Sequence, residues 1–218
     1  MPPHRAPSTD LPPSEPIRPI LCLVTDRAAS RRPLAEVVEL AVAGGVDWIQ
    51  VRARELEDGP LLDLVDRIRQ AAGQRARVLV NRRVDVALAA RADGVHLGFD
   101  GMPPETARQL LGGDALIGIA THQPGELEGA VGTPLSYAHL APIFSPLSKA
   151  QSRPPLGLAA LQEAARHGVP ILAQGGIEAE NARSCIGAGA AGVAVTGSIL
   201  SCTDPAAATA ALRKALDA

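Results

Sequence analysis

Short apolar runs alternate with longer amphipathic segments along the chain from residue 20 onward. The short runs are rich in Val, Ile and Leu, which is typical of buried β-strands. The longer segments repeat apolar residues at helical spacing, with proline near their starts and glycine near their ends. Strands are predicted at 20–25, 47–52, 77–81, 94–98, 115–120, 136–141, 170–174 and 192–196. Predicted helices include 33–45, 60–73, 103–113 and 158–168.

A strand followed by a helix, repeated eight times, predicts parallel strands joined by crossovers. An open doubly wound sheet would show the same alternation. Eight repeats within about two hundred residues, with short segments at either end, favour an α/β fold of the closed (β/α)8 TIM-barrel type. We therefore expect one TIM-barrel domain over 20–218. The preceding segment 1–19 carries seven prolines among polar residues and is expected to be disordered.

Composition and charge exclude several classes of function. The net charge of −2 offers no basic excess for a phosphodiester backbone, and four aromatic residues are too few for base-stacking platforms. Nucleic-acid binding is therefore not expected. No apolar run approaches the ~20 residues of a membrane span, and no signal peptide is visible, so a cytoplasmic protein is expected. The three cysteines lack metal-binding spacing, and no metal site is expected.

Two of the predicted strands end in glycine. The strand at 170–174 leads into Gly175 and Gly176, and the strand at 192–196 leads into Gly197 and Ser198. These are the seventh and eighth strands, after which TIM barrels often bind phosphate. Glycine lets the backbone approach an anion closely, and unpaired N–H groups can hold it. The sequence therefore predicts a phosphate site at these four residues, although tight strand-to-helix turns without a ligand would use the same residues.

Several longer motifs resemble one family, the thiamin phosphate synthase/TenI superfamily. The matching stretches are "LVTDR", "AGGVDWIQVR", "VNRRVDVALAARADGVHLG", "IGIATH", "LAPIFSPLSKAQSRPPLGL" and the two glycine turns. The resemblance covers roughly residues 20–200. It implies a TIM barrel that acts on small phosphorylated pyrimidine and thiazole compounds of thiamin biosynthesis. It also implies a homodimer.

The resemblance implies Mg²⁺ only for the synthase branch, where the ion neutralises a departing pyrophosphate. Synthases place one metal aspartate directly after the asparagine that ends strand three, but here Arg82 follows Asn81. The second aspartate falls in a word that reads "GFDGM" here, with Gly101 at its place. No cofactor is therefore expected. Asp100 remains as a carboxylate that would have to shift by one residue to restore a magnesium site.

Five other positions match the pyrophosphate side of the synthases. They are Gln50, Arg52, Asn81, Ser148 and Lys149. We interpret them as substrate-binding residues; the alternative is that they are inherited residues of the barrel mouth or solvated loop charges. The loop 144–156, rich in Ser, Pro and Lys, is expected to close over the ligand.

The TenI-type thiazole tautomerase branch needs no metal and is the closer match in the bulky residue after "HLG" and in the "SK…PPLG" loop. Its reaction shifts a proton on a carboxythiazole phosphate, and a histidine suits that task. His122 matches the catalytic histidine of that branch, whereas His96 and His139 lie mid-strand and are expected to be structural. The sequence thus indicates an isomerase of the tautomerase type. A thiamin phosphate synthase and a non-catalytic homologue that binds a phosphate ligand are the alternatives.

Overall fold

The computed structural model describes residues 18–145 and 154–218. Most of the expected extension at 1–19 lies outside these ranges. So does the middle of the loop 144–156, for which closure over a ligand was expected.

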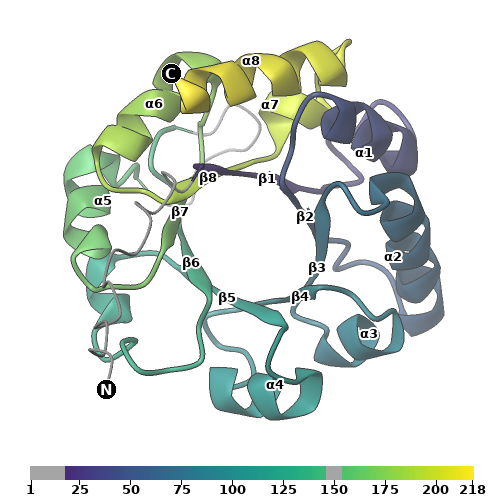
Figure 1. Ribbon diagram of the computed structural model, residues 1–218, viewed down its shortest axis with the longest axis horizontal. Helices are drawn as coiled ribbons and strands as arrows, with labels where there is room; N and C mark the ends of the chain where they lie inside the picture. The colour runs from purple at the N-terminus through teal and green to yellow at the C-terminus, as the bar shows by residue number, and fades with distance from the viewer. Residues whose placement is uncertain (1–17, 146–153) are drawn as a thin grey trace, which may run out of the picture.

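Eight parallel strands form a closed barrel in the order of the sequence, as Figure 1 shows in a view down the barrel. The strands are β1 (Ile20–Val24), β2 (Trp48–Val51), β3 (Arg77–Asn81), β4 (Gly94–Leu97), β5 (Leu116–Thr121), β6 (Tyr137–Leu140), β7 (Ile171–Gln174) and β8 (Gly192–Val195). Every boundary lies within one residue of its predicted position. The predicted TIM barrel is confirmed, and the open-sheet alternative is excluded because β1 pairs with β8.

Helices surround the barrel (Figure 1). They are α1 (Leu34–Ala43), α2 (Asp58–Ala72), α3 (Val84–Ala89), α4 (Pro104–Leu111), α5 (Gly157–Ala165), α6 (Ala179–Gly187), α7 (Gly197–Leu200) and α8 (Pro205–Asp217). The regular repeat fails between β5 and β6, where the chain forms only the 3-10 turn η1 (Pro124–Leu127). Glycines and prolines are dense in this connection, and they disfavour a longer helix.

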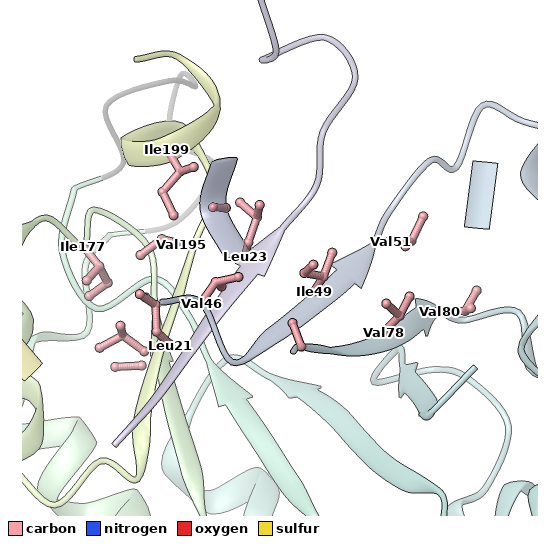
Figure 2. Packing of buried hydrophobic residues seen from close by; sticks show 14 of the residues in the cluster. Leu21, Leu23, Val46, Ile49, Val51, Val78, Val80, Ile177, Val195 and Ile199 are labelled. Carbon is pink, nitrogen blue, oxygen red and sulfur yellow. The ribbon is translucent and has the colours of Figure 1, made fainter. Parts of the chain in front are cut away.

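Alternating residues of the strands build two separate cores. Leu21 and Leu23 of β1 belong to the large core shared with the helices, together with strand residues such as Ile49 and Val78 (Figure 2). The residue between the first two, Cys22, faces the other way and belongs to a small core inside the barrel. Its other buried members are Val24, Leu79, Tyr137, Leu172 and Ala194. The barrel is therefore a packed core and not a pore.

Polar side chains also fill the inside of the barrel. The Tyr137 hydroxyl lies 3.1 Å from Nδ1 of His96, and the rings of His96 and His139 have centroids 4.2 Å apart. Gly118 makes room for the tyrosine, since a Cβ at this position would lie 2.5 Å from its hydroxyl. Both histidines are buried, as the sequence predicted.

These two histidines predict a loss of stability in acid. Burial lowers the pKa of His96 well below 6.5, with His139 adding to the shift, and burial lowers the pKa of His139 to about 3. In the unfolded chain both histidines become protonated near pH 6.5, whereas in the folded chain they stay neutral to a lower pH. The free energy of unfolding should therefore fall as pH drops below about 6.5. The fall should reach about 1.4 kcal/mol per pH unit for each histidine. Urea unfolding between pH 7.5 and pH 5 measures this slope. His139→Gln should reduce the slope, and an unchanged slope would contradict the assignment.

The two ends of the described chain lie close together at the start of β1. The Asp47 carboxylate accepts hydrogen bonds from the Leu21 backbone N–H at 2.8 Å and from the Arg213 guanidinium at 3.0 Å. The same guanidinium donates to the Pro19 carbonyl at 2.8 Å. Arg213 lies on α8, so the last helix is tied to the entry of the first strand.

Candidate functional site

The carboxyl ends of the eight strands form one rim of the barrel, where TIM barrels place their active sites. The predicted site residues that the structure describes all lie at strand ends or directly after them. Gln50 and Asn81 lie on β2 and β3, and His122 follows β5. The two glycine turns follow β7 and β8. Parallel strands therefore bring residues from distant parts of the sequence to a common rim.

The glycine turn after β7 has a packing reason as well as a candidate binding role. Gly175 and Gly176 adopt φ values of +94° and +62°, a region that favours glycine. A Cβ on Gly176 would lie 2.5 Å from the Ser145 carbonyl oxygen, and one on Gly175 would lie 2.7 Å from Cβ of Pro142. The loop after β6 thus lies directly against this turn. The tight-turn interpretation explains part of the glycine pattern.

The backbone donors of both turns are nevertheless without an acceptor in the part of the chain that the structure describes. The carbonyls of Gly175 and Gly176 are used, because they accept from the Phe144 N–H and from the Asn181 amide. Within residues 18–145 and 154–218, by contrast, the N–H groups of Gly175, Gly176, Gly197 and Ser198 meet no acceptor. All four residues are half-buried. Such N–H groups normally find a partner, so an anion would satisfy them.

A second set of polar groups lies at the ends of β2 and β3. The Gln50 side-chain amide donates to Oδ1 of Asn81 at 3.0 Å, as expected for two residues of one site. Gln50 is only 3% exposed, and its Oε1 has no donor among the described residues. A buried amide oxygen without a donor is costly, which makes it a candidate contact for a ligand N–H group.

Arg52 is held in place by two residues that sequence reasoning missed. The Arg52 guanidinium donates to Asp26 at 3.1 Å, and the Arg52 backbone N–H donates to the Thr25 hydroxyl at 2.9 Å. Thr25 is the last residue of the first predicted strand, and Asp26 follows it. Their position at the rim of the barrel was the sequence signal that could have identified them as site residues. Arg52 is therefore oriented on the rim beside β1.

His122 lies on the rim with an acidic and an aromatic neighbour. Its backbone N–H donates to Oε2 of Glu126 at 2.7 Å, and its ring Nδ1 lies 3.8 Å from the same oxygen. The Phe99 ring lies edge-on, with centroids 6.3 Å apart. The histidine side chain is 35% exposed, so a ligand can reach it. Glu126, four residues further on, was not predicted; its spacing from His122 was the only sequence signal.

The residues present do not fit the Mg²⁺ that the synthase branch implies. Arg82 donates to Asp100 at 2.6 Å, and this carboxylate is 76% exposed. A hydrogen bond from its own backbone and the Arg82 guanidinium hold the pKa of Asp100 below its usual value. No group of three potential metal ligands exists within the described ranges. The Asp100 carboxylate is therefore engaged by Arg82. Nothing in this geometry supports the alternative in which Asp100 moves by one residue to restore a magnesium site.

Two of the predicted substrate-binding residues, Ser148 and Lys149, lie outside the described residues. Their role stays a prediction. None of the described helices is long and apolar enough to cross a membrane.

The fold and the polar rim define a TIM-barrel protein with its candidate site at the carboxyl ends of the strands. A family model described as thiamine monophosphate synthase matches residues 21–199. The chain therefore belongs to this family of thiamin biosynthesis, as the sequence motifs indicated.

Similar proteins carry the same name. The chain is 43% identical to a thiamine-phosphate synthase of Anaeromyxobacter dehalogenans, over 85% of this chain and 84% of that protein. It is 39% identical to a thiamine-phosphate synthase of Roseiflexus sp., over 88% and 83% of the two chains. A thiamine phosphate pyrophosphorylase from Pyrococcus furiosus superposes with a TM-score of 0.80 at 31% identity, covering 90% of this chain and 95% of that one. These names favour the synthase alternative over the tautomerase that the sequence indicated.

Proposed function

We propose that this chain is a thiamine-phosphate synthase, which joins hydroxymethylpyrimidine pyrophosphate to thiazole phosphate. The observation that carries the proposal is the presence of two anion-attracting arrangements on one rim. Backbone N–H groups that meet no acceptor among the described residues lie after β7 and β8, and guanidinium groups follow β2 and β3. A reaction between two phosphorylated substrates needs two such subsites. The names of the relatives support the same reaction.

Each subsite has a defined task in this reaction. Gly175, Gly176, Gly197 and Ser198 hold the thiazole monophosphate through backbone N–H groups. Gln50 accepts an N–H of the aminopyrimidine at its buried Oε1, and Arg52 binds the pyrophosphate. The C–O bond between the pyrimidine methylene and pyrophosphate breaks with its electron pair on oxygen. The thiazole nitrogen supplies the pair for the new C–N bond, so the joining needs no proton donor.

Product formation tests the proposal directly. Purified protein mixed with both substrates should release thiamin phosphate and pyrophosphate in equal amounts, as measured by chromatography. The assay is run with Mg²⁺ and with a chelator, so that the need for the metal does not decide the outcome. No product under either condition would contradict the proposal. Binding of thiazole phosphate without turnover would instead indicate the non-catalytic homologue.

A metal-independent thiazole tautomerase is the second candidate, and one observation favours it. His122 is accessible on the rim, its Nδ1 faces Glu126, and Phe99 lies beside its ring. An imidazole next to a carboxylate and an aromatic wall suits a proton shift on a heterocycle. The synthase reaction, by contrast, assigns this histidine no proton to move.

His122→Ala separates the two candidates. Removing one acid–base group should lower tautomer conversion by about 10²-fold, because such a group contributes at least that much to the rate. The same variant should keep thiamin phosphate formation within about threefold, since the joining needs no general acid or base. Absorbance of the thiazole and chromatography of thiamin phosphate give the two rates. A conversion rate unaffected by the substitution would remove His122 from any tautomerase mechanism. His167→Ala, two residues beyond the end of α5, is the matched control.

A further inference from the structure

Arg82 lies on the rim in a rare backbone conformation and is held there by hydrogen bonds. It follows β3 with φ +65°, a backbone conformation that an arginine rarely adopts. Its backbone N–H donates to the His96 carbonyl at 2.8 Å, and its guanidinium donates to Asp100. The guanidinium also lies against the backbone of Gly98, where a Cβ would come within 2.7 Å of its Cζ. Gly98 thus leaves the space that the Arg82 side chain occupies, and strain of this kind clusters at functional sites.

Two more guanidinium groups belong to the same region. Arg52 and Arg54 follow β2, which pairs directly with β3. Burial lowers the pKa of Arg54, repulsion from Arg52 and Arg82 lowers it further, and only Asp100 opposes the shift. Arg54 has no ion-pair partner in the described part of the chain, whereas Arg52 and Arg82 have one each. The three arginines therefore create a local excess of positive charge.

The charge balance of this region differs from that of a metal site. A divalent cation held by two carboxylates has a net charge of zero. Here the two positions hold Arg82, which pairs with Asp100, and the uncharged Gly101. Arg52, Arg54 and Arg82 face the two paired carboxylates of Asp26 and Asp100, which leaves one positive charge without any ion. A cation at Arg82 would also repel Mg²⁺. An anion can thus be neutralised here by the protein alone.

We infer that Arg52, Arg54 and Arg82 form a metal-independent pyrophosphate site, in which the Arg82 guanidinium stands in place of the divalent cation. The inference rests on the proposed function and specifies how its leaving group is held. Arg82 uses one of its five N–H donors on Asp100 and keeps others for phosphate oxygens. When the C–O bond breaks, the electron pair moves to a pyrophosphate oxygen facing these guanidiniums.

Calorimetry with inorganic pyrophosphate tests the inference without any turnover. The full chain should bind pyrophosphate in the presence of a chelator, and excess Mg²⁺ should not tighten binding. Arg82→Ala should weaken metal-free binding about 10-fold, because it removes a charge-assisted hydrogen bond. Arg91→Ala is the matched control, since Arg91 is an exposed arginine with φ +50° that precedes β4 at the far end of the barrel. It should change the affinity less than about 2-fold, because a remote exposed charge is screened.

Two outcomes would overturn the inference. One is pyrophosphate binding that needs Mg²⁺, and the other is an equal loss in the Arg82→Ala and Arg91→Ala variants. If Arg82→Ala fails to fold, Arg82→Lys serves in its place. It keeps the charge but not the planar fork, and it should bind more weakly than the unmodified chain.

The failure of this inference and that of the proposed function are distinguishable. Thiamin phosphate formed only with Mg²⁺ would reject the metal-independent site and keep the synthase. Metal-free pyrophosphate binding without thiamin phosphate formation would keep the site and reject the synthase.

Discussion

Gly94→Ala is expected to lower the free energy of unfolding by about 3 kcal/mol, the upper range for overpacking of a core. Gly94 begins β4 and pairs with Leu116 of β5. A Cβ at this position would overlap the Leu116 carbonyl oxygen and lie 2.8 Å from the Leu116 nitrogen. These are backbone atoms of a neighbouring strand, which cannot move aside as a side chain can. Urea unfolding followed by circular dichroism measures the change.

Gly59→Ala is the control for this substitution. Gly59 lies in α2, and a Cβ there would meet no atom within 4 Å. Alanine restricts the unfolded chain and favours the helix, so stability should stay level or rise by up to about 1 kcal/mol. Equal losses in both variants would show that the strand contact is not the cause.

Gly176→Ala is expected to weaken binding of thiazole phosphate by about 10³-fold. The methyl group would lie 2.5 Å from the Ser145 carbonyl oxygen in a backbone conformation with φ +62°. The turn must therefore rotate, and two of the four N–H groups would no longer face the phosphate of the proposed site. Each hydrogen bond to a charged group contributes about 1.5–3 kcal/mol, so the loss of two gives this magnitude. Calorimetric titration with thiazole phosphate measures it.

Gly187→Ala, at the end of α6, provides the comparison, because a Cβ there meets no atom within 4 Å. It should bind thiazole phosphate like the unmodified chain. Unchanged binding by a folded Gly176→Ala variant would remove this turn from the phosphate site.

The barrel was predictable from the sequence because its strands are encoded locally. Buried parallel strands need continuous apolar runs, and the runs at 20–25 and 170–174 end within one residue of β1 and β7. The glycine turns were visible for the same reason, since they directly follow such runs. The prediction of eight strand–helix repeats was wrong between β5 and β6, where the chain forms the 3-10 turn η1 in place of a helix. The segment there is rich in Gly and Pro, which disfavour a helix.

The contacts within the candidate site were not predictable, because they join residues that only the closed barrel brings together. Nothing near Gly98 in the sequence indicates that its missing side chain makes room for Arg82. Likewise, only the structure shows that Oε1 of Gln50 has no donor within residues 18–145 and 154–218. Sequence comparison with the family identified Arg82 as a departure, whereas the structure gives it a partner and a position.

The tie between Arg213, Asp47 and Pro19 has a consequence for biosynthesis. The first strand leaves the ribosome early, but the guanidinium that ties its entry is translated 194 residues after Pro19. The hydrogen bonds that hold the start of β1 therefore cannot form until α8 has been synthesised. Truncation within α8 before Arg213 should leave the entry of β1 more accessible to proteolysis.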